Sequence, residues 1–136
     1  MIDDAPGPKC SGVFFIIQKG GVEMIIFVYG TLKKKYGNNF RLKDCPFLGE
    51  KVLTDIGLYD LGPFPMAIWQ EGAKVVCEAY ECSPEVVHGL DALEGHPYFY
   101  ERTPVNSDGL RGYVYLGKKE QVKGKFFIEK GIWERS

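Results

Sequence analysis

MIIFVYGTLK, residues Met24 to Lys33, is the stretch around which the rest of the chain is arranged. The apolar and β-branched run from Ile25 to Tyr29 predicts a short buried strand. Gly30 ends this run, because glycine allows a close backbone approach or a positive φ angle, and Thr31 favours a turn or a helix cap. Backbone N–H groups left free at such a strand end can hold a carboxylate or a phosphate. The alternative is a core strand that ends in an ordinary turn.

Composition indicates a single globular domain. A chain of 136 residues can bury a real core, and its 17 glycines and 8 prolines favour many strands and turns. The 17 basic and 18 acidic residues give a net charge of −1, so no general electrostatic attraction to nucleic acid is expected.

The cysteines and histidines do not indicate a metal site. The cysteines form no C-x-x-C pair, and the two histidines are eight residues apart, so neither zinc nor another cofactor is predicted. We interpret the cysteines as reduced thiols of a cytoplasmic protein. The residues concerned are Cys10, Cys45, Cys77, Cys82, His88 and His96.

Residues 1–23 differ from the rest of the chain. The acidic, proline-containing start cannot begin a packed element, and the apolar run Val13–Ile17 is too short to span a bilayer, so no membrane association is predicted. We expect a poorly ordered leader or extension, with the domain beginning at Met24 and able to fold and act from there. The alternative is that Val13–Ile17 adds an edge strand.

Several strands and turns are predicted after the first strand. Phe47 to Leu61 is typical of a strand bent at Gly49 and Gly57. Before it, residues 33–43 favour one or two weak helical turns, in which Arg41 is either a surface charge or faces a bound anion. After it, Gly62–Pro65 is a rigid turn that would wall a pocket with Phe64 and Met66.

The next segment is predicted to form a hairpin. Met66–Trp69 and Lys74–Cys82 are interpreted as two strands joined around Glu71-Gly72. Alternation in the second strand places Val75, Cys77 and Ala79 on one face and Val76, Glu78, Tyr80 and Cys82 on the other. Glu78 then lies either on a partly wet face or near a site.

A helix is predicted from Pro84 to Glu94. Ser83 is a favoured N-cap, proline suits the first helical position, and Gly95 suits the end of the helix. At about 100° per residue, Glu94 falls on the same face as the apolar side chains of the helix. Those side chains are Val86, Val87, Leu90 and Leu93.

The position of Glu94 has chemical consequences. Loss of solvation and the partial negative charge at a helix C-terminus both favour the neutral acid, so the pKa of Glu94 should be raised. Such a glutamate can accept and return a proton near neutral pH. The alternative is a frayed helix end from which the side chain turns into water.

An aromatic segment and a second hairpin follow the helix. Tyr98 to Tyr100 is interpreted as core, or alternatively Tyr100 donates its hydroxyl into a site. Glu101–Val105 and Gly112–Leu116 are predicted strands around an Asp108-Gly109 turn. Residues 118–136 hold six basic and three acidic side chains and are predicted to form a basic C-terminal surface tail. Four apolar residues would pack this tail back in part: Phe126, Phe127, Ile128 and Trp133.

Several of these motifs, taken in order, resemble the gamma-glutamylcyclotransferase-like family, in its AIG2-like and gamma-glutamylamine cyclotransferase-like branch. They are FVYGTLK at 27–33, Pro65, CEAYE at 77–81, LDALEG at 90–95 and YER at 100–102. The resemblance covers Met24 to about Leu116. The chain departs from the family at Cys77, where glycine is frequent, and in having residues before Met24.

The resemblance implies an α+β fold, a small mixed and mostly antiparallel β-barrel with a few packed helices, spanning residues 24–117. It also implies a cavity that Glu94 enters as the catalytic proton carrier. The implied substrate-binding residues are Tyr29, Gly30, Thr31, Leu32, Pro65 and Tyr100, with the loop N–H groups holding the glutamyl moiety.

The implied reaction converts a small gamma-glutamyl compound, either a gamma-glutamylamine or a gamma-glutamyl amino acid, to 5-oxoproline and a free amine. The nucleophile is the α-amine of the substrate, so no serine, cysteine or metal is required. Two alternatives stay open: a binding or regulatory module that keeps the pocket without turnover, and recruitment of an acidic partner by the basic tail. The sequence indicates neither the leaving amine nor the oligomeric state.

Overall fold

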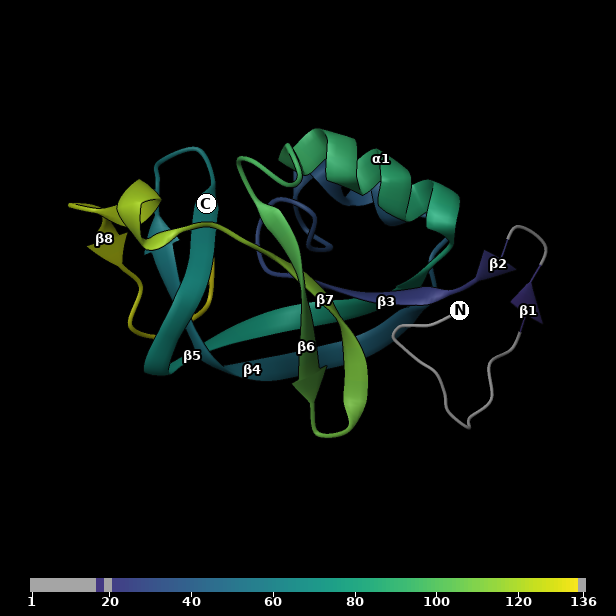
Figure 1. Cartoon of the computed structure of the whole chain (residues 1–136), viewed down its shortest axis with the longest axis horizontal. Coiled ribbons are helices and arrows are strands. Elements are labelled where there is room, and N and C mark those ends of the chain that lie inside the picture. Colours follow the sequence, from purple (N-terminus) through teal and green to yellow (C-terminus); the bar gives the residue numbers. More distant parts are fainter. Residues whose placement is uncertain (1–16, 19–20, 135–136) are drawn as a thin grey trace.

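The computed structural model describes residues 17–18 and 21–134. At its N-terminal end, β1 (Ile17–Gln18) and β2 (Gly21–Val22) pair with each other in an antiparallel two-stranded ladder (Figure 1). Most of the predicted leader, including residues 13–16 of the possible edge strand, lies outside the described residues.

A six-stranded sheet forms the centre of the molecule, in the order β6-β7-β3-β5-β4-β8 (Figure 1). Only β3 and β7 run parallel, and the other neighbours are antiparallel. The prediction of an α+β fold with a mixed, mostly antiparallel sheet is therefore confirmed. The strands are β3 (Met24–Val28), β4 (Phe47–Asp60), β5 (Pro65–Cys82), β6 (Glu101–Ser107), β7 (Leu110–Leu116) and β8 (Phe126–Phe127).

The sheet curls into a half-barrel and does not close, so the implied β-barrel takes an open form. Its two outer strands, β6 and β8, share no ladder within residues 21–134. The curl brings the end of β6 against β4, where the Ser107 hydroxyl donates to the Val52 carbonyl at 3.0 Å. Closure has little backbone to use, because β8 has two residues and Pro104 in β6 lacks an N–H donor.

The predicted hairpin around Glu71-Gly72 is also wrong. β5 continues from Pro65 to Cys82 and pairs with β4 on both sides of these residues. Gly72 adopts a φ of 85°, as in a turn, but its N–H donates to the Asp55 carboxylate at 3.0 Å within a bulge. The chain reverses earlier, where the Leu61 N–H donates to the Phe64 carbonyl at 3.0 Å.

Of the two bends predicted at glycines in β4, the one at Gly49 is confirmed and the one at Gly57 is wrong. The register shifts between Phe47 and Gly49, as predicted. The second shift falls at Asp55, between Thr54 and Ile56, and Gly57 stays paired with Ile68.

Hydrophobic clusters lie on both faces of the sheet. The predicted alternation of β5 is confirmed, because Val75, Cys77 and Ala79 pack in one cluster while Tyr80 and Cys82 pack in the other. The second of these clusters includes the buried residues of the helix that covers this face.

That helix is α1 (Pro84–Glu94), which lies over the sheet in Figure 1 and has the predicted limits. The Val86 N–H donates to the Ser83 hydroxyl at 3.3 Å, and Gly95 ends the helix in the left-handed conformation. Leu90 is buried, but Leu93 is 38% exposed, so the apolar stripe reaches beyond the core. Residues 33–43 contain the 3-10 helix η2 (Gly37–Leu42).

The C-terminal segment packs more extensively than the sequence predicts. It contains the 3-10 helix η3 (Lys119–Val122) and β8, which pairs with β4. Trp133 is 2% exposed in the core, and the nearby Gly131 carbonyl accepts the Val76 N–H at 2.8 Å.

Two glycine-to-alanine substitutions test the close approach of β3 to β7 and the helix propensity of α1. A Cβ at Gly112 in β7 would lie 2.5 Å from the Ile25 carbonyl oxygen, so Gly112→Ala should destabilise the fold by roughly 1–3 kcal/mol. Gly89 in α1 has open space at the same position, so Gly89→Ala should stabilise by about 0.5–1 kcal/mol through helix propensity. Urea denaturation measures both changes. A Gly112→Ala variant as stable as the original chain would contradict the close β3–β7 approach.

Candidate active site

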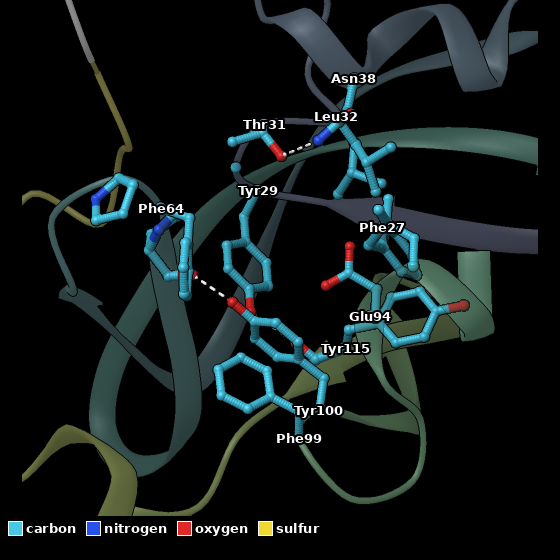
Figure 2. A pocket seen from close by; sticks show the side chains of 15 residues that line it. Phe27, Tyr29, Thr31, Leu32, Asn38, Phe64, Glu94, Phe99, Tyr100 and Tyr115 are labelled. Atoms are coloured by element: carbon cyan, nitrogen blue, oxygen red, sulfur yellow. Dashed lines mark hydrogen bonds between the residues drawn. The ribbon is translucent and has the colours of Figure 1, made fainter.

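A cavity of about 250 Å³ opens between the end of β3, the β4–β5 turn and the C-terminal end of α1 (Figure 2). Stretches that lie far apart in the sequence therefore contribute to one site. The catalytic and substrate-binding residues that the family resemblance implies all line this cavity: Tyr29, Gly30, Thr31, Leu32, Pro65, Glu94 and Tyr100.

The loop after β3 presents free backbone donors. Gly30 is required there because a Cβ would come within 2.9 Å of the Pro65 ring. The loop is shaped by hydrogen bonds to the Gly30 and Thr31 carbonyls, from the N–H groups of Lys33 at 3.0 Å and Asn38 at 3.1 Å. Within the described part of the chain, the N–H groups of Gly30, Thr31 and Leu32 donate to no protein acceptor. They remain available to a ligand.

Side chains behind the loop hold it in place. Glu78 of β5 accepts the Lys34 N–H at 2.8 Å and the Tyr80 hydroxyl at 2.9 Å. The buried Lys33 ammonium donates to the Trp133 carbonyl at 2.9 Å. Glu78 is half-buried and supports the loop from outside the cavity lining, so its position is near the site and not in it.

Two tyrosines form walls of the cavity, and their hydroxyls are occupied. The Tyr29 hydroxyl donates to the Tyr115 carbonyl at 2.7 Å and accepts the Ala67 N–H at 3.1 Å. The Tyr100 hydroxyl donates to the Pro65 carbonyl at 2.8 Å (Figure 2). Burial raises the pKa of both hydroxyls, so they stay neutral. Tyr100 thus belongs to both the core and the cavity wall.

Glu94 is the last residue of α1, and its side chain points toward the aromatic rings of the cavity (Figure 2). Its side chain is half-buried, and no hydrogen bond to its carboxylate occurs among the described residues. Loss of hydration raises the pKa of Glu94 to about 7, and the positive charge of Arg41 opposes this shift. The carboxyl group therefore exchanges a proton near neutral pH.

Arg41 lies at the edge of this arrangement. It is exposed in η2, and its Nε donates to the Asn38 side-chain oxygen at 3.5 Å. Asn38 lines the cavity and donates to the Thr31 hydroxyl at 2.9 Å. Arg41 is thus a surface charge whose field reaches the loop end of the cavity.

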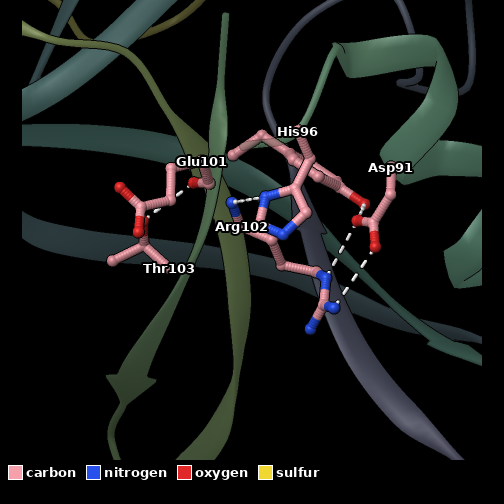
Figure 3. Close-up of polar contacts among 6 residues, drawn as sticks. Asp91, His96, Glu101, Arg102 and Thr103 are labelled. Atoms are coloured by element: carbon pink, nitrogen blue, oxygen red, sulfur yellow. Dashed lines mark hydrogen bonds and ion pairs between the residues drawn. The ribbon is translucent and has the colours of Figure 1, made fainter. Parts of the chain in front are cut away.

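A polar cluster ties the end of α1 to the sheet (Figure 3). Arg102 of β6 donates to both carboxylate oxygens of Asp91, at 2.9 and 3.2 Å, and the Tyr115 hydroxyl donates to Asp91 at 2.6 Å. Burial works against ionisation here, but the bonds from Arg102 and Tyr115 hold the pKa of Asp91 below its usual value. The Arg102 N–H also donates to His96 Nδ1 at 3.0 Å. Glu94 lies between these two anchor points in the sequence.

Sequence reasoning missed several cavity residues. Phe64 lines the cavity as expected, whereas Met66 is fully buried in the core cluster against which Phe64 packs. The unanticipated lining residues include Asn38, Leu93, Phe99 and Tyr115. Phe99 and Tyr115 reach the cavity from segments that are distant in the sequence, and Asn38 is held there by bonds to Thr31, seven residues earlier. The helical stripe predicts Leu93 in the core.

Two further features, a metal-binding cluster and a membrane-spanning helix, do not occur in the described part of the chain. It contains no group of three or more His, Cys, Asp or Glu side chains arranged to hold a metal ion. None of its helices combines the length and apolarity needed to cross a membrane.

Comparison with known proteins places these features in a family. Residues 26–135 match the family model described as "Gamma-glutamyl cyclotransferase, AIG2-like". A Citrobacter rodentium protein named as a gamma-glutamylcyclotransferase family protein is 33% identical over 110 residues, or 81% of this chain and 95% of that protein. The zebrafish gamma-glutamylaminecyclotransferase B is 31% identical over 100 residues, which cover 65% of this chain and 51% of that protein.

A solved structure of another protein of this kind has a similar fold. The solution structure of ytfP from Escherichia coli superposes with a TM-score of 0.66 and 31% identity, covering 81% of this chain and 96% of that one.

The raised pKa of Glu94 predicts a pH-dependent effect of Glu94→Gln on stability. The folded chain holds a proton at Glu94 up to about pH 7, whereas the ordinary value is 4.5. The folded state thus binds more protons between these values, and the stability that this contributes is lost as the pH rises through about 7. Glu94→Gln has no such proton and so no such pH-dependent contribution to stability. The melting temperature of the variant minus that of the original chain should therefore increase from about pH 5 to pH 8. Thermal melts across this range measure it. A difference that does not vary with pH would contradict the raised pKa.

Proposed function

Because the chain belongs to the gamma-glutamyl cyclotransferase, AIG2-like family, we propose that it converts a gamma-glutamyl compound to 5-oxoproline and a free amine, with Glu94 carrying the proton. The substrate is a gamma-glutamylamine or a gamma-glutamyl amino acid. The observation that carries the proposal is the position of Glu94: it is the one carboxylate among the residues lining the cavity, and it titrates near neutral pH.

The reaction is intramolecular. The α-amine nitrogen of the glutamyl group attacks its own γ-carbonyl carbon, which forms the C–N bond of a five-membered lactam. The bond from that carbon to the leaving nitrogen then breaks. Glu94 accepts the proton released by the attacking nitrogen and donates it to the leaving nitrogen, so no water or other reactant is consumed.

The cavity suits this reaction because most of the catalytic work is positioning. A gamma-glutamyl chain must fold back on itself before it cyclises, and a site that holds this conformer lowers the entropic part of the barrier. The free N–H groups of Gly30, Thr31 and Leu32 are suited to bind the glutamyl carboxylate at one end of the cavity. Donors near the loop would also stabilise negative charge that develops on the carbonyl oxygen.

The pKa of Glu94 matches its proposed task. A proton carrier works best when its pKa lies near the working pH, because it must both accept and return the proton. Burial raises the pKa of this carboxyl to about 7, well above an ordinary glutamate. The name of the zebrafish relative, a gamma-glutamylaminecyclotransferase, supports the amine branch of the family.

Glu94→Gln tests the proton carrier. The amide keeps the shape of the side chain but cannot carry the proton, so turnover should fall by about a hundredfold or more while the variant still binds a substrate analogue. Release of 5-oxoproline from a panel of gamma-glutamyl compounds is the measurement, and the wild-type rate should decline as the pH falls below about 7.

Glu85→Gln is the matched control, because Glu85 is exposed in the first turn of the same helix and outside the cavity lining. It should keep normal turnover. Near-normal activity of Glu94→Gln would remove Glu94 from the mechanism. An inactive wild-type chain across the whole panel would favour a binding or regulatory module.

The loop is tested by a bound ligand. In a crystal structure with glutamate or 5-oxoproline, we expect the carboxylate within hydrogen-bonding distance of the N–H groups of Gly30, Thr31 or Leu32, because these donors lack protein acceptors. A ligand that occupies the cavity with its carboxylate turned away from this loop would show that the glutamyl group is recognised elsewhere.

A further inference from the structure

The two ends of the cavity differ in chemistry (Figure 2). At the loop end are the free N–H groups, the Thr31 hydroxyl and the Asn38 amide, with Arg41 beyond them. At the opposite end, Phe64 and Phe99 approach from the β4–β5 turn and from the segment after α1 (Figure 2). Glu94 is positioned between these two ends.

The far end is apolar and partly open. The Phe64 and Phe99 rings meet edge to face with centroids 6.1 Å apart, and Phe99 stacks in the same manner on Tyr100 at 5.0 Å. Phe99 is 43% exposed and Leu93 is 38% exposed, so this wall leaves apolar surface in contact with water. A ligand group that covers such a surface gains affinity if it is itself apolar.

The polar groups near this wall are already occupied. The Tyr29 and Tyr100 hydroxyls bond to backbone carbonyls, and the Tyr115 hydroxyl bonds to Asp91. A leaving group that enters this end therefore meets ring faces and no free hydroxyl.

Charge also separates the two ends. Glu94 is the single charged side chain among the lining residues, and the nearby cation, Arg41, lies at the loop end. The Lys118 ammonium lies outside the lining and donates to the Tyr98 carbonyl at 3.4 Å. A carboxylate on the leaving amine would thus lose hydration beside an aromatic wall and be repelled by ionised Glu94.

From this asymmetry we infer that the site selects gamma-glutamyl compounds whose amine part is apolar, preferably aromatic, and lacks a carboxylate. Phe64, Leu93 and Phe99 are the specificity-determining residues. The inference rests on the proposed cyclotransferase function and narrows its substrate from gamma-glutamyl compounds in general to amides of apolar amines. The apolar wall attracts an apolar amine part, and it also excludes an amine part with a carboxylate, because that carboxylate finds no hydrogen-bond or charge partner there.

Matched substrate pairs test this selection. Gamma-glutamyl-phenethylamide and gamma-glutamyl-phenylalanine differ by one carboxylate, as do gamma-glutamyl-ethylamide and gamma-glutamyl-alanine. We expect kcat/KM for 5-oxoproline release to favour the carboxylate-free member of each pair by about tenfold or more. The phenethylamide should exceed the ethylamide by a similar factor. Intrinsic reactivity works in the other direction, because the less basic amine of an amino acid leaves more readily.

Variants of the wall separate its two effects. Phe99→Ser should reduce the preference for phenethylamide over ethylamide about tenfold, while Trp69→Ser, at an exposed aromatic on β5 outside this cavity, should not. Leu93→Lys adds a cation at the rim and should narrow the carboxylate discrimination severalfold. Leu93→Met is its neutral control, because methionine keeps an apolar side chain of similar volume without a donor, and it should leave that ratio in place. Lys118→Gln should also leave the ratio unchanged.

Each outcome has a separate meaning. If no compound of the panel yields 5-oxoproline, the proposed function fails and this inference fails with it. If the amides are turned over and the carboxylate-bearing members react equally well or better, the selection is overturned while the cyclotransferase function stands. Equal changes in Phe99→Ser and Trp69→Ser would also overturn it, since the wall would then have no specific effect.

Discussion

The anchoring of the C-terminal end of α1 to the sheet is the constraint on which the site depends. Asp91 is held by two bonds from Arg102 and one from Tyr115, and the backbone of Arg102 is bound to His96. These contacts stand on either side of Glu94 in the sequence. A glutamate at a loose helix end would turn into water and titrate normally, whereas a fixed end keeps this carboxylate among aromatic rings. The raised pKa is therefore a consequence of tertiary structure as much as of the helix itself.

The polar groups around the cavity divide into structural and available ones. The hydroxyl of Tyr29, directly after β3, bonds to backbone atoms of β5 and β7, and the hydroxyl of Tyr100, after α1, bonds to a backbone carbonyl of β5. Burial keeps both hydroxyls neutral, so they stabilise the walls and expose ring faces. What remains available is Glu94 and the N–H donors of the loop. A reaction whose nucleophile belongs to the substrate needs little more than these groups.

Local signals in the sequence predicted the parts of the fold that depend on local interactions. Ser83, Pro84 and Gly95 define α1 through its own caps, and the helical period places Glu94 correctly. The hairpin prediction failed because Gly72 has the backbone of a turn residue, and only its bond to Asp55, 17 residues earlier, shows that it belongs to a bulge. Phe99 and Tyr115 reach the cavity through packing between distant segments, which no local pattern encodes. The aromatic wall, and with it the inferred selectivity, therefore needed the structure.

The same apolar wall has two consequences for the proposed chemistry. It removes water from around Glu94, which favours the protonated acid and brings its pKa close to neutral. It also makes the region beside Glu94 unfavourable for a second negative charge. A carboxylate on the leaving amine would raise the pKa of Glu94 further and so reduce the ionised fraction that accepts the first proton. Tuning of the proton carrier and exclusion of charged leaving groups thus have one physical origin, the dehydrated aromatic end of the cavity.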